Sequence, residues 1–125
     1  MTAPNIVGVT TIVGVTTFLS LANTNSNVIV SNPADSNYVY KINSIIVAND
    51  GGSTTRKVTV NLHSEAAGAG TSISIAKNVG ISSESTLVVL DKASSIYLEE
   101  NKSISISANA ANELDVVCSY ETIVD

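Results

Sequence analysis

Charged side chains are missing from the first 34 residues of this 125-residue chain, and the first one is Asp35. The whole sequence has six basic and eleven acidic residues, a net charge of −5, and its one adjacent basic pair is Arg56-Lys57. Proteins that bind nucleic acid need clustered lysine and arginine to neutralise phosphates. This charge balance therefore predicts that nucleic acid is not a partner.

Residues that carry catalytic or metal chemistry are also scarce. The sequence has one cysteine, Cys118, one histidine, His63, and no tryptophan. A single cysteine forms no internal disulfide, and one histidine with one cysteine cannot complete a four-ligand zinc site. The acidic residues are scattered without the spacing of a calcium-binding loop, although Asp50 could meet Glu99 or Glu100 in space. We expect no metal, no cofactor and no enzymatic activity.

His63 falls on the polar phase of its strand pattern, which predicts a solvated side chain. Cys118 is in phase with Val116 and Tyr120, which predicts a buried thiol in the core. A hydrolase would need His63 within about 3 Å of a serine or cysteine nucleophile. No Gly-x-Ser-x-Gly sequence is present to supply a nucleophile elbow.

Aromatic residues make up only 4% of the chain, although sugar-binding surfaces rely on exposed aromatic rings. Tyr38 and Tyr40 are two residues apart on one face, where packing at a sheet margin is the expected role. A carbohydrate-binding or adhesive module stays open as an alternative, and it would require Tyr38, Tyr40 and Tyr97 to converge on an exposed groove.

Alternating apolar and polar residues recur along almost the whole chain, separated by turn-forming residues. About eight such segments at roughly ten-residue spacing are typical of a β-sandwich. The pattern predicts an all-β fold: a single antiparallel β-sandwich, jelly-roll-like, with an extended N-terminal arm. Within residues 38–49 the alternation changes phase, which predicts a bulge or a strand buried on both faces. Residues 49–53 carry a hairpin signal, and residues 87–90 are expected to form a central buried strand.

The most distinctive feature is a tandem hexapeptide, Ile-Val-Gly-Val-Thr-Thr, at residues 6–11 and again at 12–17. Six is a multiple of the strand period of two, so both copies would present the same side chains to the same face of one extended strand. We expect residues 1–26 to form an arm and residues 27–125 to form the sandwich domain.

An uncharged, β-branched strand edge is a template for pairing with another chain, and soluble proteins normally protect such an edge with charge or proline. The arm has neither from residue 6 to residue 22, so we expect it to dock onto a partner. The predicted docking residues are Ile6, Val7, Val9, Ile12, Val13, Val15, Phe18, Leu19 and Leu21. A six-residue slip would preserve much of the repeat's pattern, so we expect Phe18, Leu19 and Leu21, which lie outside it, to fix the register.

A membrane is not an expected partner. Residues 6–22 are shorter than the span of about 20 apolar residues that a bilayer requires, and they include four threonines and two glycines. The N-terminus has no basic region before an apolar run, so no secretory signal is expected. We expect synthesis in the cytoplasm.

Several segments occur in an order and spacing that is similar to a known family: residues 40–49, 58–62, 75–79, 85–92, 96–100, 107–117 and 119–121. Over residues 38–124 the chain resembles small β-rich virion structural proteins of tailed bacteriophages, particularly those that infect cyanobacteria. The resemblance does not include the tandem hexapeptide, and it supplies no catalytic residues.

The resemblance implies a non-enzymatic structural protein located in the virion and made in the cytoplasm of a host bacterium. We expect a capsid decoration (cement) protein that docks by its N-terminal β-arm onto the major capsid protein, as a homo-oligomer such as a trimer. A neck, tail or fibre-attachment component is the alternative, in which the arm would contact neck or tail subunits.

Overall fold

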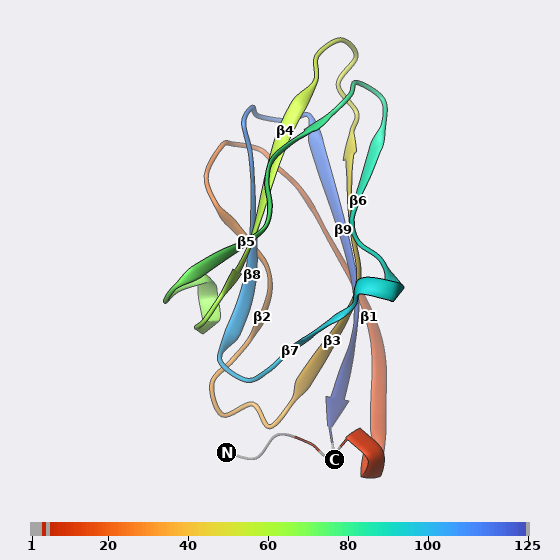
Figure 1. Ribbon diagram of the computed structural model, residues 1–125, viewed down its shortest axis with the longest axis vertical. Helices are drawn as coiled ribbons and strands as arrows, with labels where there is room; N and C mark the ends of the chain where they lie inside the picture. The colour runs from red at the N-terminus through yellow and green to blue at the C-terminus, as the bar shows by residue number, and fades with distance from the viewer. Residues whose placement is uncertain (1–3, 5, 125) are drawn as a thin grey trace.

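The structure is a computed structural model that describes residue 4 and residues 6–124. Two antiparallel β-sheets pack face to face as a sandwich (Figure 1). Nine strands are present in the described residues: β1 (Thr11–Ser20), β2 (Asn27–Asn32), β3 (Val39–Asn49), β4 (Arg56–His63), β5 (Ser72–Ile81), β6 (Thr86–Leu90), β7 (Ile96–Leu98), β8 (Lys102–Ala108) and β9 (Leu114–Val124). Three single-turn 3₁₀ helices accompany them: η1 (Ile6–Gly8), η2 (Ala66–Gly68) and η3 (Lys92–Ser94).

One sheet has the strand order β1-β9-β3-β6, with β7 also paired to β3, and the other has the order β2-β8-β4-β5. Successive strands lie in opposite sheets except for β4–β5 and β6–β7, each of which stays in one sheet, and this strand order is the jelly-roll arrangement. The predicted all-β sandwich is therefore confirmed. The ninth strand arises because β6 and β7 follow one another along the same edge of β3, separated by η3. At this interruption Asp91 caps the turn by accepting a hydrogen bond from the Ser94 amide.

The core lies between the sheets. Many of its fully buried side chains come from β3, β4, β8 and β9: Ile42, Ile45, Val58, Val60, Ile104, Ile106, Leu114 and Val116. Cys118 is 1% exposed, so its predicted core position is confirmed. Of the two explanations for the phase change in residues 38–49, the structure shows the bulge, since the β3–β9 register shifts between Ile42 and Ser44.

Two predictions about local strand order are wrong. Residues 49–53 do not close a hairpin, because β3 and β4 lie in different sheets and the loop crosses between them. The side chain of Asn49 holds this crossover, donating hydrogen bonds to the carbonyls of Thr54 and Ile81. Residues 87–90 belong to an edge strand, not a central one, and Val88 is 56% exposed. An apolar run indicates a strand but not its position in the sheet.

Candidate docking edge

Strand β1 lies at one edge of the five-stranded sheet, at the lower right of Figure 1. It pairs with β9 through ten consecutive positions, from Thr11 opposite Val124 to Ser20 opposite Asp115, without a bulge. Among the described residues no strand pairs with its other edge. Residues 11–20 of the expected arm are thus part of the sandwich, and no described strand is hydrogen-bonded to the outer side of this regular ladder. The division of the chain at residue 26 stays a prediction.

The two copies of the hexapeptide have different conformations. Residues 12–17 lie within β1, whereas Ile6–Gly8 of the first copy forms the 3₁₀ turn η1. Thr11, the last residue of the first copy, lies opposite Val124, and the β1–β9 ladder of the described residues does not include residues 6–10. The expectation of one extended strand over both copies is therefore wrong for the first copy. Identical sequence gives different structure here because pairing, not propensity, decides where a strand forms.

Side chains of β1 alternate between solvent and the interior. The odd positions Val15, Thr17 and Leu19 are half-buried and face the second sheet, while the even positions face outward. Phe18 is 81% exposed and Ile12 is 54% exposed. The outer face of the edge is therefore uncharged, and Ile12 and Phe18 are its apolar side chains.

The remaining predicted docking residues differ widely in exposure. Ile6, Val7 and Val13 are 47%, 97% and 51% exposed, and Val9 is half-buried. Leu21 is completely buried, its amide donates to the Leu114 carbonyl, and its carbonyl accepts from the Asn112 amide. Leu21, with support from the half-buried Leu19, can thus fix the register of β1. Phe18 contributes little burial to that register, and Leu21 is not available to a partner.

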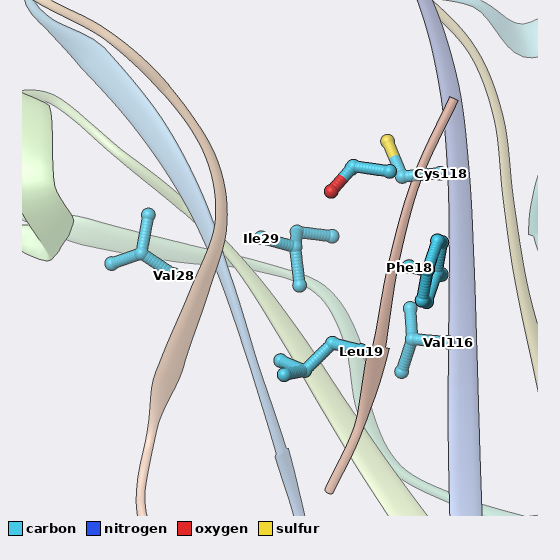
Figure 2. A pocket seen from close by; sticks show the side chains of 7 residues that line it. Phe18, Leu19, Val28, Ile29, Val116 and Cys118 are labelled. Atoms are coloured by element: carbon cyan, nitrogen blue, oxygen red, sulfur yellow. The ribbon is translucent and has the colours of Figure 1, made fainter. Parts of the chain in front are cut away.

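A small groove opens between β1 and β2, where the two sheets separate (Figure 2). Its volume is about 90 Å³, and its lining residues are Thr17, Phe18, Leu19, Val28, Ile29, Val116 and Cys118. Figure 2 shows Leu19 and Ile29 reaching into the space between the strands, with Phe18 on the other side of β1. Burial raises the pKa of the Cys118 thiol to about 12, so the groove holds a protonated, unreactive thiol at neutral pH.

An apolar row crosses the outer face of the five-stranded sheet, a feature that the sequence analysis missed. Phe18 faces Val117 across the β1–β9 pair, Val117 faces Ile46, and Ile46 faces Val88. Phe18 and Val88 are exposed, and Val117 and Ile46 are half-buried. The sequence signal was the apolar doublets Val116-Val117 and Ile45-Ile46, because a strand with one solvated face would alternate instead.

The other sheet edges have features that hinder pairing with another chain. The β2 ladder has a bulge at Val28–Val30, and the β5 ladder has register shifts at Val58–Val60 and Val60–Asn61. On the β6–β7 edge the pairing is broken by η3. Bulges and short edge strands are the usual protection against strand addition. Among the described edges, β1 alone is long, regular and uncharged.

His63 is not solvated, contrary to the sequence expectation. Its side chain is 8% exposed, and its Nε2 is hydrogen-bonded to Ser105 Oγ at 2.6 Å. The strand phase did not predict this position, because the burial of His63 and its bond to Ser105 of β8 depend on pairing between distant strands. A histidine–serine pair at this distance meets the first requirement for a hydrolase. However, Ser105 is 1% exposed and His63 Nδ1 has no hydrogen-bond partner, so neither an accessible nucleophile nor an orienting carboxylate is present.

The acidic residues meet differently from the sequence expectation. Asp50 lies beside Asp115, and a hydrogen bond and like charge from Asp115 raise the pKa of Asp50. The Asp50 amide donates to the Glu113 carbonyl, while the Glu113 carboxylate forms an ion pair with Arg56. In residue 4 and residues 6–124 no three histidine, cysteine or acidic side chains are grouped as metal ligands.

The tyrosines do not form a common groove. Tyr38 and Tyr40 have ring centroids 6.3 Å apart, and Tyr40 and Tyr120 are 5.2 Å apart. Tyr97 is 48% exposed and makes no ring contact with them among the described pairs. Tyr40 and Tyr120 are half-buried and Tyr38 is exposed, and the three rings form one cluster, as expected for packing at a sheet margin. Burial, the largest cause, raises the pKa of both Tyr40 and Tyr120.

No helix within the described part of the chain is long and apolar enough to span a bilayer. No protein-family model matches the sequence, and no curated protein matches it significantly. A solved structure from work on Bacillus endospore appendages, which are disulfide-linked pili, is similar in fold. The TM-score is 0.54 at 18% sequence identity, over 91% of this chain and 88% of that chain. At this identity the likeness shows the sandwich fold alone.

Proposed function

We propose that this protein is a non-enzymatic structural subunit that joins a larger protein assembly by strand addition at the free edge of β1. The observation that carries the proposal is that edge: ten regularly paired residues without charge, proline or bulge, with Ile12 and Phe18 exposed beside it. Strand addition gains affinity from main-chain hydrogen bonds and specificity from alternate side chains.

For the assembly itself we propose the virion of a tailed phage, with this chain as a capsid decoration protein made in the host cytoplasm. The support is the resemblance over residues 38–124, and a neck or tail component remains the alternative within the same proposal. The docking partner is then the major capsid protein or a neck or tail subunit, contacted through Ile12, Val13 and Phe18 of β1.

The pilus protein with a similar fold is also an assembled protein, and its assembly is described as disulfide-linked. This chain has one cysteine, which is buried. Assembly through β1 would therefore depend on backbone hydrogen bonds and apolar contact, without a covalent link.

The test is to purify particles from the phage that encodes this chain and to count its copies against the major capsid protein by quantitative mass spectrometry. Hundreds of copies per particle are expected for decoration, and a few to a few dozen would assign it to the neck or tail. Absence from the particle would overturn the virion proposal.

A Gly14→Lys variant, which places a charge in the middle of β1, is expected to lose incorporation, whereas Gly52→Lys in a distant loop is expected to retain it.

Both glycines suit this comparison because a Cβ at either position meets no atom within 4 Å. The two variants therefore add the same charge without steric strain, and only Gly14 lies on the proposed docking edge.

A further inference from the structure

The edge of β1 must be covered in the free protein as well, since an exposed ladder of this kind promotes aggregation. We propose that β1 pairs antiparallel with β1 of a second copy, about a two-fold axis at Val15. This inference rests on the proposed function in that both use the same edge, and it names the partner that covers the edge before assembly.

Strand geometry restricts how two copies can pair. In an antiparallel ladder, the side chains of two opposed residues point to the same face of the sheet. The N–H and C=O groups of such a pair either both point toward the partner strand or both point away from it. Two copies of β1 therefore fit only when positions of equal parity face each other. A two-fold axis that passes beside Val15 sets Val15 opposite Val15 of the second copy, and an axis beside Thr16 does the same for Thr16. Either axis brings nine of the ten residues of β1 opposite a residue of the second β1.

The side chains favour the axis at Val15. That axis places Ile12 of each copy opposite Phe18 of the other copy, so the pair occurs twice. Ile12 and Phe18 are the two most exposed apolar side chains on the outer face of β1. An aromatic ring opposite a β-branched side chain is a favourable cross-strand pair. An axis at Thr16 would instead set Ile12 against Ser20 and Phe18 against Gly14, and would lose both apolar pairs.

Charge also favours a second copy at this edge. Each copy has a net charge of −5, but residues 1–34 carry no charged side chain. The nearest carboxylates to the edge in the β1–β9 ladder are Glu121 and Asp115 on β9, opposite Gly14 and Ser20. In the pair, the two β9 strands would be three strand spacings apart, about 14 Å. That separation exceeds the Debye length of about 8 Å at physiological ionic strength.

The remaining edges fit less well as the partner of β1. Bulges interrupt the β2 and β5 ladders, and η3 interrupts the β6–β7 edge. A two-fold pairing of β1 with itself needs no second edge, and it gives a closed dimer. A trimer closed through β1 would need β1 to pair with one of these interrupted edges, so for the free protein the inference replaces the trimer that the phage resemblance implies with a dimer.

The first experiment tests the partner and the register by oxidative cross-linking. Val15→Cys places two thiols directly opposite each other across the axis, within the range that a disulfide can bridge. Val13→Cys is the matched control on the same face, where the two thiols would be separated by four residues along the strand, about 13 Å. The native Cys118 is buried and is present in both variants. We expect a covalent dimer from Val15→Cys and none from Val13→Cys.

The second experiment measures the mass of the unmodified chain by sedimentation equilibrium over a range of concentrations. At 150 mM salt we expect a dimer of twice the 12.9 kDa chain mass, with at least tenfold weaker association in Gly14→Lys and unchanged association in Gly52→Lys. Circular dichroism of both variants checks that the sandwich is retained.

A wild-type chain that stays monomeric at millimolar concentration would overturn the inference, as would equal cross-linking of the two cysteine variants. These outcomes are separate from failure of the proposed function. A dimer that forms while Gly14→Lys still enters particles normally would overturn strand addition as the docking mode and leave the dimer intact.

Discussion

At the scale of single residues, Leu21 has more influence on β1 than any residue of the repeat. It is fully buried. Its amide donates a hydrogen bond to Leu114 at the start of β9, and its carbonyl accepts one from Asn112 in the β8–β9 connection. Phe18, three positions earlier, is the larger side chain but is 81% exposed. Size and hydrophobicity in the sequence therefore did not distinguish the anchor from the exposed ring.

We expect Leu21→Ala to lower the free energy of unfolding by about 2–5 kcal/mol, because it leaves a cavity in the core. Phe18→Ala, at an exposed position, should change it by less than about 0.5 kcal/mol at concentrations where the chain is monomeric. Urea unfolding followed by circular dichroism measures both values. Equal losses in the two variants would show that Phe18 is buried in solution and would contradict the assignment of Leu21 as the anchor.

At the scale of elements, the tandem repeat shows how far sequence can predict structure. The hexapeptide is equally suited to a strand in both copies, yet only residues 12–17 lie in one. Residues 12–17 pair with β9 and residues 6–8 do not, and such long-range pairing is a property that no local pattern contains. For the same reason the period-two pattern predicted β9 and the core position of Cys118, but it could not show that β6 lies at an edge or that neighbours cover His63.

The candidate edge was predicted in part. Absence of charge identified the segment, and apolar alternation identified Ile12 and Val15 as strand residues. The bulges that make the other edges unsuitable depend on pairing between distant strands, so only the structure reveals the contrast. The apolar row through Phe18 and Val88 likewise depends on the register of four strands.

Because β1 is paired on one side only, its amides should exchange with solvent in a period of two. At concentrations where the chain is monomeric, we expect alternate amides of residues 11–20 to be protected by β9 and the intervening ones to exchange rapidly. Amides of residues 6–10 should lack this alternation. Hydrogen exchange followed by NMR measures the pattern, and uniform protection along β1 in the monomer would mean that its second edge is already covered.

Hydrogen exchange at high protein concentration tests whether β1 pairs with a second copy. If β1 pairs with a second copy, the rapidly exchanging amides should slow by an amount that rises with concentration, while those facing β9 change little. No change at any concentration would be evidence against pairing through this edge.

At the scale of the whole molecule, the distribution of charge is uneven in a way that favours one mode of association. All acidic residues lie at Asp35 or later, whereas the free edge of β1 is uncharged. Two copies therefore repel one another through their overall charge of −5 but meet without like charges at β1. Long-range repulsion and short-range attraction should consequently respond in opposite ways to salt.

We expect dimerisation to strengthen several-fold when sodium chloride is raised from 10 to 150 mM, because the Debye length falls from about 30 Å to about 8 Å and screens the repulsion between the two copies. Main-chain hydrogen bonds and apolar contact at β1 are not weakened by this change. Sedimentation equilibrium at each salt concentration gives the dissociation constants.

Gly52→Lys raises the net charge by one and should show a smaller salt effect with the same dimer at high salt. Weaker dimerisation at higher salt would indicate that oppositely charged surfaces hold the copies together, and it would contradict pairing through the uncharged edge.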